Sequence, residues 1–258
     1  MVNPKTGHGK ARFYAVWLLI EHPEKGLYLF DTGYSPRFYE ATRPFPQRIY
    51  RWMTPTHIQP EETAVRQLAN LDIRPADLSG IIISHFHADH VAGLLDFPNV
   101  PIFCHEAALQ QALSLQGMTA VKNGIIKSLL PDDLEKRTTV LPSTFHPLPS
   151  TLHPLPSTVF NDFFGDGSLE WILLPGHACG QIGVRINAPD HTLFFAADAA
   201  WRKSTLMDNI LPSQLVRLFF HDWQAYKTTF ASLRAYQQEN PKHRLLFTHC
   251  PETMSFIA

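Results

Sequence analysis

Residues 81–90 read Ile-Ile-Ile-Ser-His-Phe-His-Ala-Asp-His, so that an apolar run passes directly into metal-binding side chains. The three isoleucines are typical of a short, fully buried strand. The polar residues that follow are His85, His87, Asp89 and His90. Burying so many polar groups at a strand end is costly unless a bound metal ion satisfies them. The stretch therefore predicts a buried strand that leads into a metal site.

The spacing of these four side chains indicates two metal positions rather than one. Alternate residues of an extended segment share a face, so His85 and His87 are expected to bind one ion together. Asp89 and His90 follow as the chain turns, and they point to a second position beside the first. Four ligands do not complete two metal sites, so further ligands are needed from elsewhere in the chain.

Three later segments offer such ligands, each at the end of a strand-like run. Leu173–His177 ends in a histidine beside a glycine, Phe194–Asp198 ends in an aspartate, and Leu245–His249 ends in a histidine. Any one of these residues alone is more often a capping or surface residue. Three of them at strand ends downstream of the first motif favour a shared metal site.

The rest of the chain alternates between strand-like and helix-like segments, which describes a layered α/β domain. Strands are predicted over residues 13–20, 27–30, 81–83, 100–103, 171–174, 192–196 and 244–247. Helices are predicted from Pro60 to about residue 71, over about 106–115 and over 222–238. Residues 34–57 are rich in proline, arginine and aromatic residues without a regular period, and we interpret them as a loop with room for one short helix.

The order of the motifs, HxHxDH followed by a distant His, Asp and His, resembles the metallo-β-lactamase-fold hydrolase superfamily. The resemblance runs from Asp31 to His249 and lies closest to the branch of N-acyl-homoserine lactonases and glyoxalase II. It implies an α/β fold of the four-layer αββα sandwich type, with a dinuclear metal site at one edge of the two sheets. We expect residues 1–258 to form a single domain of this kind.

The resemblance also implies a role for each ligand. His85, His87 and His177 would hold one ion, while Asp89, His90 and His249 would hold the other. Asp198 would bridge both ions. Asp31, in an Asp-Thr-Gly turn, resembles the family's aspartate that orients a ligand histidine, because ligand imidazoles usually donate their other N–H to a carboxylate or carbonyl.

The expected cofactor is a pair of divalent metal ions. The ligand atoms are nitrogen and oxygen, which favours Zn²⁺ and leaves Fe or Mn possible. Cys250 adjoins His249 and offers a thiolate alternative, although the histidine has the family position. Cys179 has no assigned role, and His221 is the remaining histidine most able to reach the pocket.

Such a site predicts hydrolysis by metal-activated water. Asp198 and Asp89 are the expected catalytic carboxylates: Asp198 sets the metal separation, and Asp89 orients the hydroxide and then protonates the leaving group. The first choice of reaction is opening of an ester or lactone bond, as in a lactonase. A thioesterase of the glyoxalase II type and a phosphodiesterase are alternatives. A β-lactamase is less favoured because Asp198 is a bridging carboxylate, and a non-catalytic metal-binding member is disfavoured because all seven positions are filled.

The composition of the chain limits the classes of binding partner. The 258 residues include 22 Lys and Arg against 23 Asp and Glu, a net charge of −1 that argues against nucleic acid. No segment approaches the roughly 18 apolar residues of a membrane span. We therefore expect a small-molecule substrate and no membrane partner, with the oligomeric state left open. The aromatic segment 34–52 and the apolar segment 211–220 are candidate walls of an acyl pocket.

The cysteine content and the N-terminal apolar run indicate the cellular compartment. Three cysteines make no disulfide framework, which indicates the cytoplasm. The apolar run 13–20 superficially resembles a signal peptide, but no small-residue cleavage pattern follows it, and a β-hairpin explains it better.

Residues 145–151 and 152–158 are tandem copies around His-Pro-Leu-Pro-Ser-Thr. Their prolines predict an exposed extended loop at about 142–158.

Overall fold

The computed structural model describes residues 12–141 and 160–254. It divides into two compact units, one formed by Trp17–Ser143 and the other by Met1–Val16 together with Thr144–Ala258. The tandem repeat at 142–158 lies outside the described residues, so its expected loop structure stays a prediction. The expectation of a single domain also stays a prediction.

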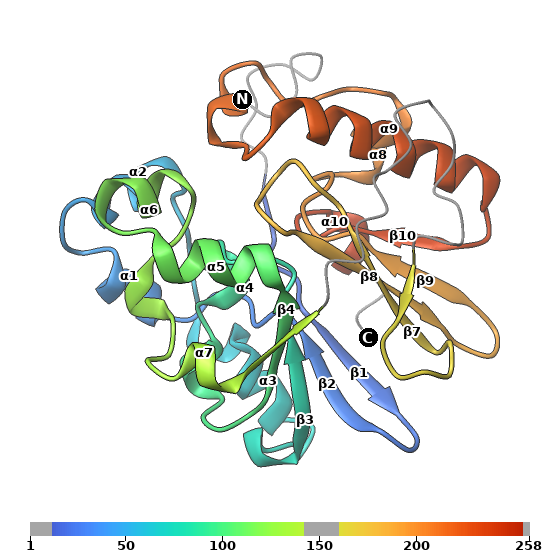
Figure 1. The fold of residues 1–258 in the computed structure, drawn as a ribbon, viewed down its shortest axis with the longest axis horizontal. Helices are drawn as coiled ribbons and strands as arrows, with labels where there is room; N and C mark the ends of the chain where they lie inside the picture. Colours follow the sequence, from blue (N-terminus) through green and yellow to red (C-terminus); the bar gives the residue numbers. More distant parts are fainter. Residues whose placement is uncertain (1–11, 142–159, 255–258) are drawn as a thin grey trace. The chain divides into compact units, whose positions relative to one another are not determined.

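The unit Trp17–Ser143 is built on a five-stranded sheet in the order β1-β2-β3-β4-β5 (Figure 1). Its strands are β1 (Leu18–His22), β2 (Gly26–Phe30), β3 (Leu78–Ile82), β4 (Ile102–His105) and β5 (Thr138–Leu141). The first two strands form an antiparallel hairpin, and β2, β3, β4 and β5 pair in parallel. The carboxyl ends of these parallel strands therefore lie at one edge of the sheet.

Short helices surround this sheet. They are α1 (Arg37–Ala41), α2 (Gln47–Met53), α3 (Ala64–Ala69), α4 (Ala88–Val91), α5 (Glu106–Ser114), α6 (Gly117–Lys122) and α7 (Leu134–Arg137). Single 3-10 turns occur at Pro60–Glu62, Pro75–Asp77, Leu94–Asp96 and Lys127–Leu129. Leu68 of α3 and Leu109 of α5 belong to the same buried cluster as Ile81 and Ile102 of the sheet. The β-branched run is thus the centre of this core, as predicted.

The other unit carries a second sheet, in the order β10-β9-β8-β7-β6. Its elements are β6 (Asn161–Asp162), β7 (Leu169–Leu173), β8 (Ile182–Asn187), β9 (Thr192–Phe195), α8 (Lys203–Met207), a 3-10 turn at Val216–Phe219, α9 (Trp223–Glu239), β10 (Arg244–Leu246) and α10 (Pro251–Met254). The sheet is antiparallel except for β9 and β10.

The long helix α9 covers this second sheet. Phe230 and Leu233 of α9 are buried in one cluster with Phe194 of β9 and Leu245 of β10. The helix begins after Asp222, whose carboxylate Oδ1 accepts hydrogen bonds from the backbone N–H groups of residues 224 and 225. This is the usual N-cap arrangement, and it fixes the start of the helix.

Three predicted elements differ clearly from the structure. The helix predicted from Pro60 to about residue 71 divides into a 3-10 turn at Pro60–Glu62 and α3 at Ala64–Ala69. The first strand begins at Leu18, not at residue 13. Residues 34–57 contain two helices, α1 and α2, where we expected at most one. Fully buried Phe38 explains this, because the rings of Tyr34 and Tyr50 pack against it with centroids 5.1 and 6.0 Å away. Long-range aromatic packing, rather than local periodicity, therefore organises this segment.

Strand β8 was not predicted, although Ile182, Val184 and Ile186 alternate along it as a strand requires.

No helix within the described ranges is long and apolar enough to cross a membrane.

Candidate metal centre

The first group of predicted ligands lies where β3 ends. The chain stays extended through His87, whose φ of −70° and ψ of 153° make it the N-cap of α4. Helix α4 then carries Asp89 and His90. The change from extended chain to helix separates the pair His85 and His87 from the pair Asp89 and His90, as the spacing predicts.

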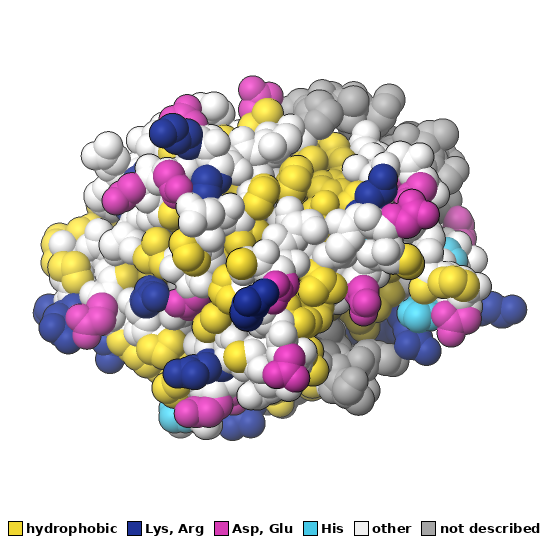
Figure 2. Space-filling view, turned by 90° about the horizontal axis from the view of Figure 1, so that it is seen from below, with side chains coloured by type: hydrophobic (Ala, Val, Ile, Leu, Met, Phe, Trp, Pro, Cys, Tyr) yellow, Lys and Arg dark blue, Asp and Glu magenta, His cyan; other side chains and the backbone are white. Residues whose placement is uncertain are grey.

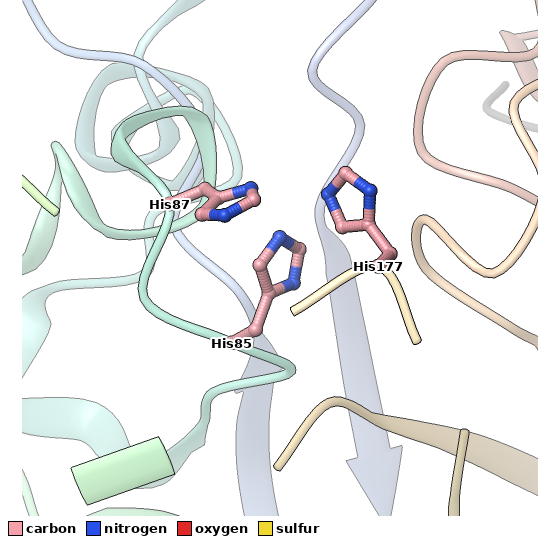
Figure 3. A group of neighbouring side chains, drawn as sticks. All are labelled: His85, His87 and His177. Atoms are coloured by element: carbon pink, nitrogen blue, oxygen red, sulfur yellow. The ribbon is translucent and has the colours of Figure 1, made fainter. Parts of the chain in front are cut away.

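The imidazoles of this first group lie close together. The ring centroids of His85 and His87 are 4.5 Å apart, and those of His85 and His90 are 4.0 Å apart. His85 and His87 each have a ring nitrogen within 4.8 Å of the other, a spacing at which both can bind one ion. Figure 3 shows both side chains rising from the loop after β3; its third labelled residue, His177, comes from the loop after β7.

A glycine makes room for His87. Gly124 has a φ of +74°, and a Cβ atom added there would lie 2.2 Å from Cδ2 of His87. Because no side chain fits at that distance, the position of the His87 ring depends on glycine at residue 124.

Asp31 holds the other ring of this group, that of His90. The carboxylate Oδ2 of Asp31 lies 2.7 Å from Nδ1 of His90, and both residues are fully buried. Asp31 also accepts hydrogen bonds from the backbone N–H and the hydroxyl of Ser84, at 2.8 and 2.7 Å. Burial raises the pKa of Asp31, and the contacts with His90 and Ser84 offset part of that rise. The arrangement fixes His90 through Nδ1, so that Nε2 is its candidate metal-binding atom.

The second group of predicted ligands lies in the other unit, at the ends of three of its strands. Asp198 follows β9, His177 follows β7 and His249 follows β10. The Oδ2 atom of Asp198 lies 2.8 Å from Nε2 of His249 and 3.4 Å from Nε2 of His177. The other ring nitrogen of His249, Nδ1, contacts the backbone carbonyl of Tyr14. One carboxylate oxygen is thus placed between two imidazole nitrogens.

Helix α9 positions the loop that carries His177. The backbone N–H groups of residues 221 and 222 donate to the carbonyls of His177 and Gly176, at 3.0 and 2.9 Å. The hydroxyl of Thr229 donates to the carbonyl of Pro175 at 2.7 Å. Gly176 has a φ of +128°, and a Cβ atom there would lie 2.2 Å from the backbone of Tyr226. The loop therefore rests directly on the helix.

Aromatic rings line this second group of ligands. Phe220 meets the ring of His177 edge-on at 5.2 Å, and Trp201 does so at 6.4 Å. Phe13 meets His249 at 5.5 Å and Trp201 at 5.9 Å. We call Phe13, Trp201 and Phe220 the aromatic wall. Its members come from three distant segments of the chain.

Of the aromatic wall, the sequence analysis included only Phe220, in the segment 211–220, and it singled out none of the supports at Gly124, Tyr14 and Thr229. Only the fold brings these residues to the ligands, and no local motif marks them.

Cys250 is buried, and its sulfur accepts a hydrogen bond from the backbone N–H of Lys203 at 3.4 Å. The side chain of His221 is exposed, and its contribution is the backbone bond to His177.

The donor atoms fit divalent metal ions. The candidate ligands are imidazole nitrogens and carboxylate oxygens, a donor set that suits Zn²⁺ and also Fe or Mn. His90 and His249 are each fixed from behind through Nδ1, by a carboxylate and by a backbone carbonyl. Support of this kind is typical of metal-ligating histidines.

Comparison with known proteins identifies the family. The family model described as the metallo-beta-lactamase superfamily matches residues 11–239. A probable metallo-hydrolase of Mycobacterium tuberculosis is 24% identical over 204 residues, which cover 73% of this chain and 58% of the mycobacterial protein. The N-acyl homoserine lactonase AttM of Azorhizobium caulinodans is 25% identical over 217 residues, 83% of this chain and 76% of that protein.

Solved structures share the fold. An N-acyl homoserine lactone hydrolase with the product N-hexanoyl-L-homoserine at its catalytic metal centre superposes with a TM-score of 0.70 at 19% identity, covering 99% of this chain and 89% of the other. The dizinc quorum-quenching lactonase AidC gives 0.60 at 18% identity, with 91% and 72% covered. The predicted fold class is confirmed, and this chain belongs to the metallo-beta-lactamase superfamily.

Proposed function

We propose that this protein is a metal-dependent hydrolase that opens an ester or lactone bond in a small molecule. The observation that carries the proposal is the position of Asp198, whose Oδ2 atom lies within 3.4 Å of the Nε2 atoms of His177 and His249. A carboxylate oxygen placed between two imidazole nitrogens suits a bridging ligand. The chain also keeps every position of the motif that the family uses for metal binding.

The proposed site holds two divalent ions, with Zn²⁺ as the first choice. The seven ligands divide as the family order implies, with Asp198 shared: His85, His87 and His177 for one ion, and Asp89, His90 and His249 for the other. Asp31 and the Tyr14 carbonyl would orient His90 and His249 through their Nδ1 atoms.

When bound, two such ions lower the pKa of a shared water toward about 7 and polarise the substrate carbonyl. The residues of the chain supply the rest. Asp198 would be the ligand that the two ions share. The side chain of Asp89 is 11% exposed and its Oδ2 atom lies 3.7 Å from Nε2 of His90. In the proposed mechanism, Asp89 orients the hydroxide and then gives a proton to the leaving oxygen.

The aromatic wall supports an uncharged, apolar group on the substrate. Phe13, Trp201 and Phe220 present their rings around His177 and His249, and the charge beside them is the guanidinium of Arg202, 5.8 Å from the ring centroid of Phe13. A lactone or ester with an acyl chain suits such surroundings better than a charged thioester or a phosphodiester does. The names of the AttM relatives and of the structure with a bound acyl-homoserine product support the same substrate class.

The test combines metal analysis with a substrate panel. The purified protein is loaded with Zn²⁺, desalted, and assayed against an acyl-homoserine lactone, S-lactoylglutathione, a cephalosporin and bis-p-nitrophenyl phosphate. We expect close to two equivalents of zinc and fastest turnover of the lactone. Asp198→Asn should lower kcat by at least about 100-fold, as loss of one preorganised catalytic group does elsewhere. The surface variant Asp77→Asn serves as the control.

Other outcomes have definite meanings. Faster turnover of S-lactoylglutathione or of the phosphodiester would replace the lactonase by the corresponding alternative. Two bound zinc ions without turnover of any substrate class would favour a non-catalytic member. Full activity of Asp198→Asn would exclude the bridging role.

A further inference from the structure

Helix α2 and the turn before it carry large apolar side chains that are exposed. Phe45, Trp52 and Met53 are 72%, 72% and 51% exposed. Phe45 lies in the turn that precedes α2, two residues before the first helical residue. The exposed apolar residues therefore lie at both ends of α2, with Phe45 before its first residue and Trp52 and Met53 in its last turn.

The opposite side of α2 already has a partner. Tyr50, two residues before Trp52 and so on the other side of the helix, is half-buried and packs on Phe38 with ring centroids 6.0 Å apart. The exposed aromatic residues are thus not core residues that the helix failed to bury. A surface helix normally places polar residues on its outer side, and here that side carries tryptophan and phenylalanine.

Helix α6 lies against α2 and extends the exposed surface. Met118 at its start is 48% exposed, and Lys122 at its end is also exposed. We call Phe45, Trp52, Met53 and Met118 the apolar patch.

Positive charge surrounds the apolar patch. Residues 41–60 contain three arginines (Arg43, Arg48 and Arg51) and no aspartate or glutamate, a charge of +3 in a chain whose net charge is −1. The remaining residues therefore carry −1 − 3 = −4. Arg43 pairs with Glu40 at 2.8 Å, whereas Arg48 and Arg51 have no acidic partner in the described part of the chain. On the face shown in Figure 2, most Lys and Arg side chains lie near Asp or Glu.

We propose that the apolar patch docks on an anionic lipid surface. Tryptophan and phenylalanine favour the headgroup level of a membrane, and arginines beside them bind lipid phosphates. Helix α2 would lie in the plane of the interface, with Phe45 and Trp52 inserted and Arg48 and Arg51 at the phosphates. This revises our expectation of no membrane partner, which rested on the lack of a spanning segment.

Charge decides against a second copy of the chain as the occupant. A two-fold contact through the patch would place Arg48 and Arg51 of one copy near the same residues of the other. Like charges brought together in this way oppose association. An anionic surface instead complements them, and Arg51 is already positioned, with its guanidinium 5.0 Å from the ring centroid of Tyr39.

Vesicle sedimentation tests the proposal without any turnover. The zinc-loaded full chain is mixed with vesicles of phosphatidylcholine alone and with vesicles containing 30% phosphatidylglycerol, about 30% being enough to give a negative surface potential. We expect binding to the anionic vesicles only, weakened by 0.5 M salt, about the level at which charges are strongly screened. Trp52→Ser should weaken partitioning about tenfold, and Arg48→Gln with Arg51→Gln about 25-fold.

The matched control is Leu218→Ser, since Leu218 is a 67% exposed apolar residue in the other unit. It should change partitioning less than about twofold. All these side chains are exposed, so the variants should keep the melting temperature of the parent. Absence of wild-type binding, or equal effects of Trp52→Ser and Leu218→Ser, overturns the proposal. A dimer that Trp52→Ser converts to monomer, without vesicle binding, would make a second copy the occupant.

Discussion

The Nδ1 atom of His90 and the Oδ2 atom of Asp31 lie 2.7 Å apart, although 59 positions separate the two residues in the sequence. Asp31 follows β2 and His90 lies in α4, just beyond the end of the neighbouring strand β3. The pairing of two adjacent parallel strands therefore sets the orientation of a proposed metal ligand. Sheet geometry and metal affinity are coupled at this point.

Asp31→Asn tests that coupling. The amide keeps the shape of the side chain but removes the negative charge that holds the protonated Nδ1 of His90. We expect zinc affinity to fall about 10- to 100-fold, the usual cost of losing a group that orients a metal ligand. Competition with a fluorescent chelator measures it. Asp77→Asn, at an exposed ion pair with Arg74, should leave the affinity unchanged; equal affinities of the two variants would contradict the prediction.

Gly124→Ala should displace His87. The new methyl group would lie 2.2 Å from Cδ2 of the ring, and residue 124 has a φ of +74°. Gly117→Ala is the matched control, because its φ is +54° and its Cβ would meet open space. Both changes carry the strain of a left-handed alanine, about 1–2 kcal/mol. Gly124→Ala should destabilise the protein by about 1–3 kcal/mol more, the usual cost of overpacking, and should weaken zinc binding.

Urea unfolding and metal competition on the two glycine variants separate these effects. If Gly124→Ala and Gly117→Ala bind zinc equally well, the position of the His87 ring does not depend on residue 124.

Thr229→Val should loosen the loop that carries His177. It removes the hydroxyl that donates to the carbonyl of Pro175 at 2.7 Å, and the expected loss is about 1 kcal/mol in the free energy of unfolding. Thr228→Val is the control, since its hydroxyl bonds only within α9, to the carbonyl of Gln224 at 3.3 Å. Thermal unfolding of both variants, with and without zinc, gives the comparison. A larger loss for Thr228→Val would show that the Thr229 contact has no special role.

Ala197→Gly should stabilise the protein. Ala197 precedes Asp198 and has a φ of 46°, a left-handed conformation that costs alanine about 1–2 kcal/mol and glycine almost nothing. The expected gain is about 1 kcal/mol in the free energy of unfolding. Ala199→Gly, at a buried position without a positive φ, should lose stability instead. Chemical denaturation measures both, and a loss in Ala197→Gly would show that its methyl contacts outweigh the strain.

Cys104 should be inert to thiol reagents. Burial raises its pKa to about 12, so the reactive thiolate is scarce at pH 8. Of the three cysteines, half-buried Cys179 should account for most of the labelling by Ellman's reagent in the native state. Because the unfolded thiol ionises near pH 9, Cys104 stabilises the fold below that value. Its contribution is lost as the pH rises from about 9 to 12.

A titration of the unfolding free energy on the wild type and on Cys104→Ala checks that sign. The wild type should lose more stability above pH 9 than the variant does. Rapid native labelling of Cys179→Ser would contradict the expected burial.

The sequence could single out the candidate ligands because the first residue of each motif follows an apolar run that periodicity can recognise. The run 81–83 marks a buried strand, and the polar residues after it stand out against that background. The helical spacing of Phe230 and Leu233 made α9 equally clear. These signals are local, so one sequence contains them.

The features that the sequence analysis missed depend on contacts between residues far apart in the chain. The two helices in residues 34–57 depend on Phe38, which is buried by rings up to 12 residues away. Gly124 matters because of a contact with His87, 37 residues earlier, and the Tyr14 carbonyl reaches His249 across 235 positions. No pattern of neighbouring residues encodes such contacts.

Four of the proposed ligands lie only three or four residues after the end of a strand. They are His85 after β3, His177 after β7, Asp198 after β9 and His249 after β10. Phe13 and Phe220 of the aromatic wall instead belong to segments outside both sheets. Divergence during evolution can therefore act on the two sets of residues separately. Descendants of this chain can exchange wall residues and acquire new substrates while they inherit the same ion-binding shell.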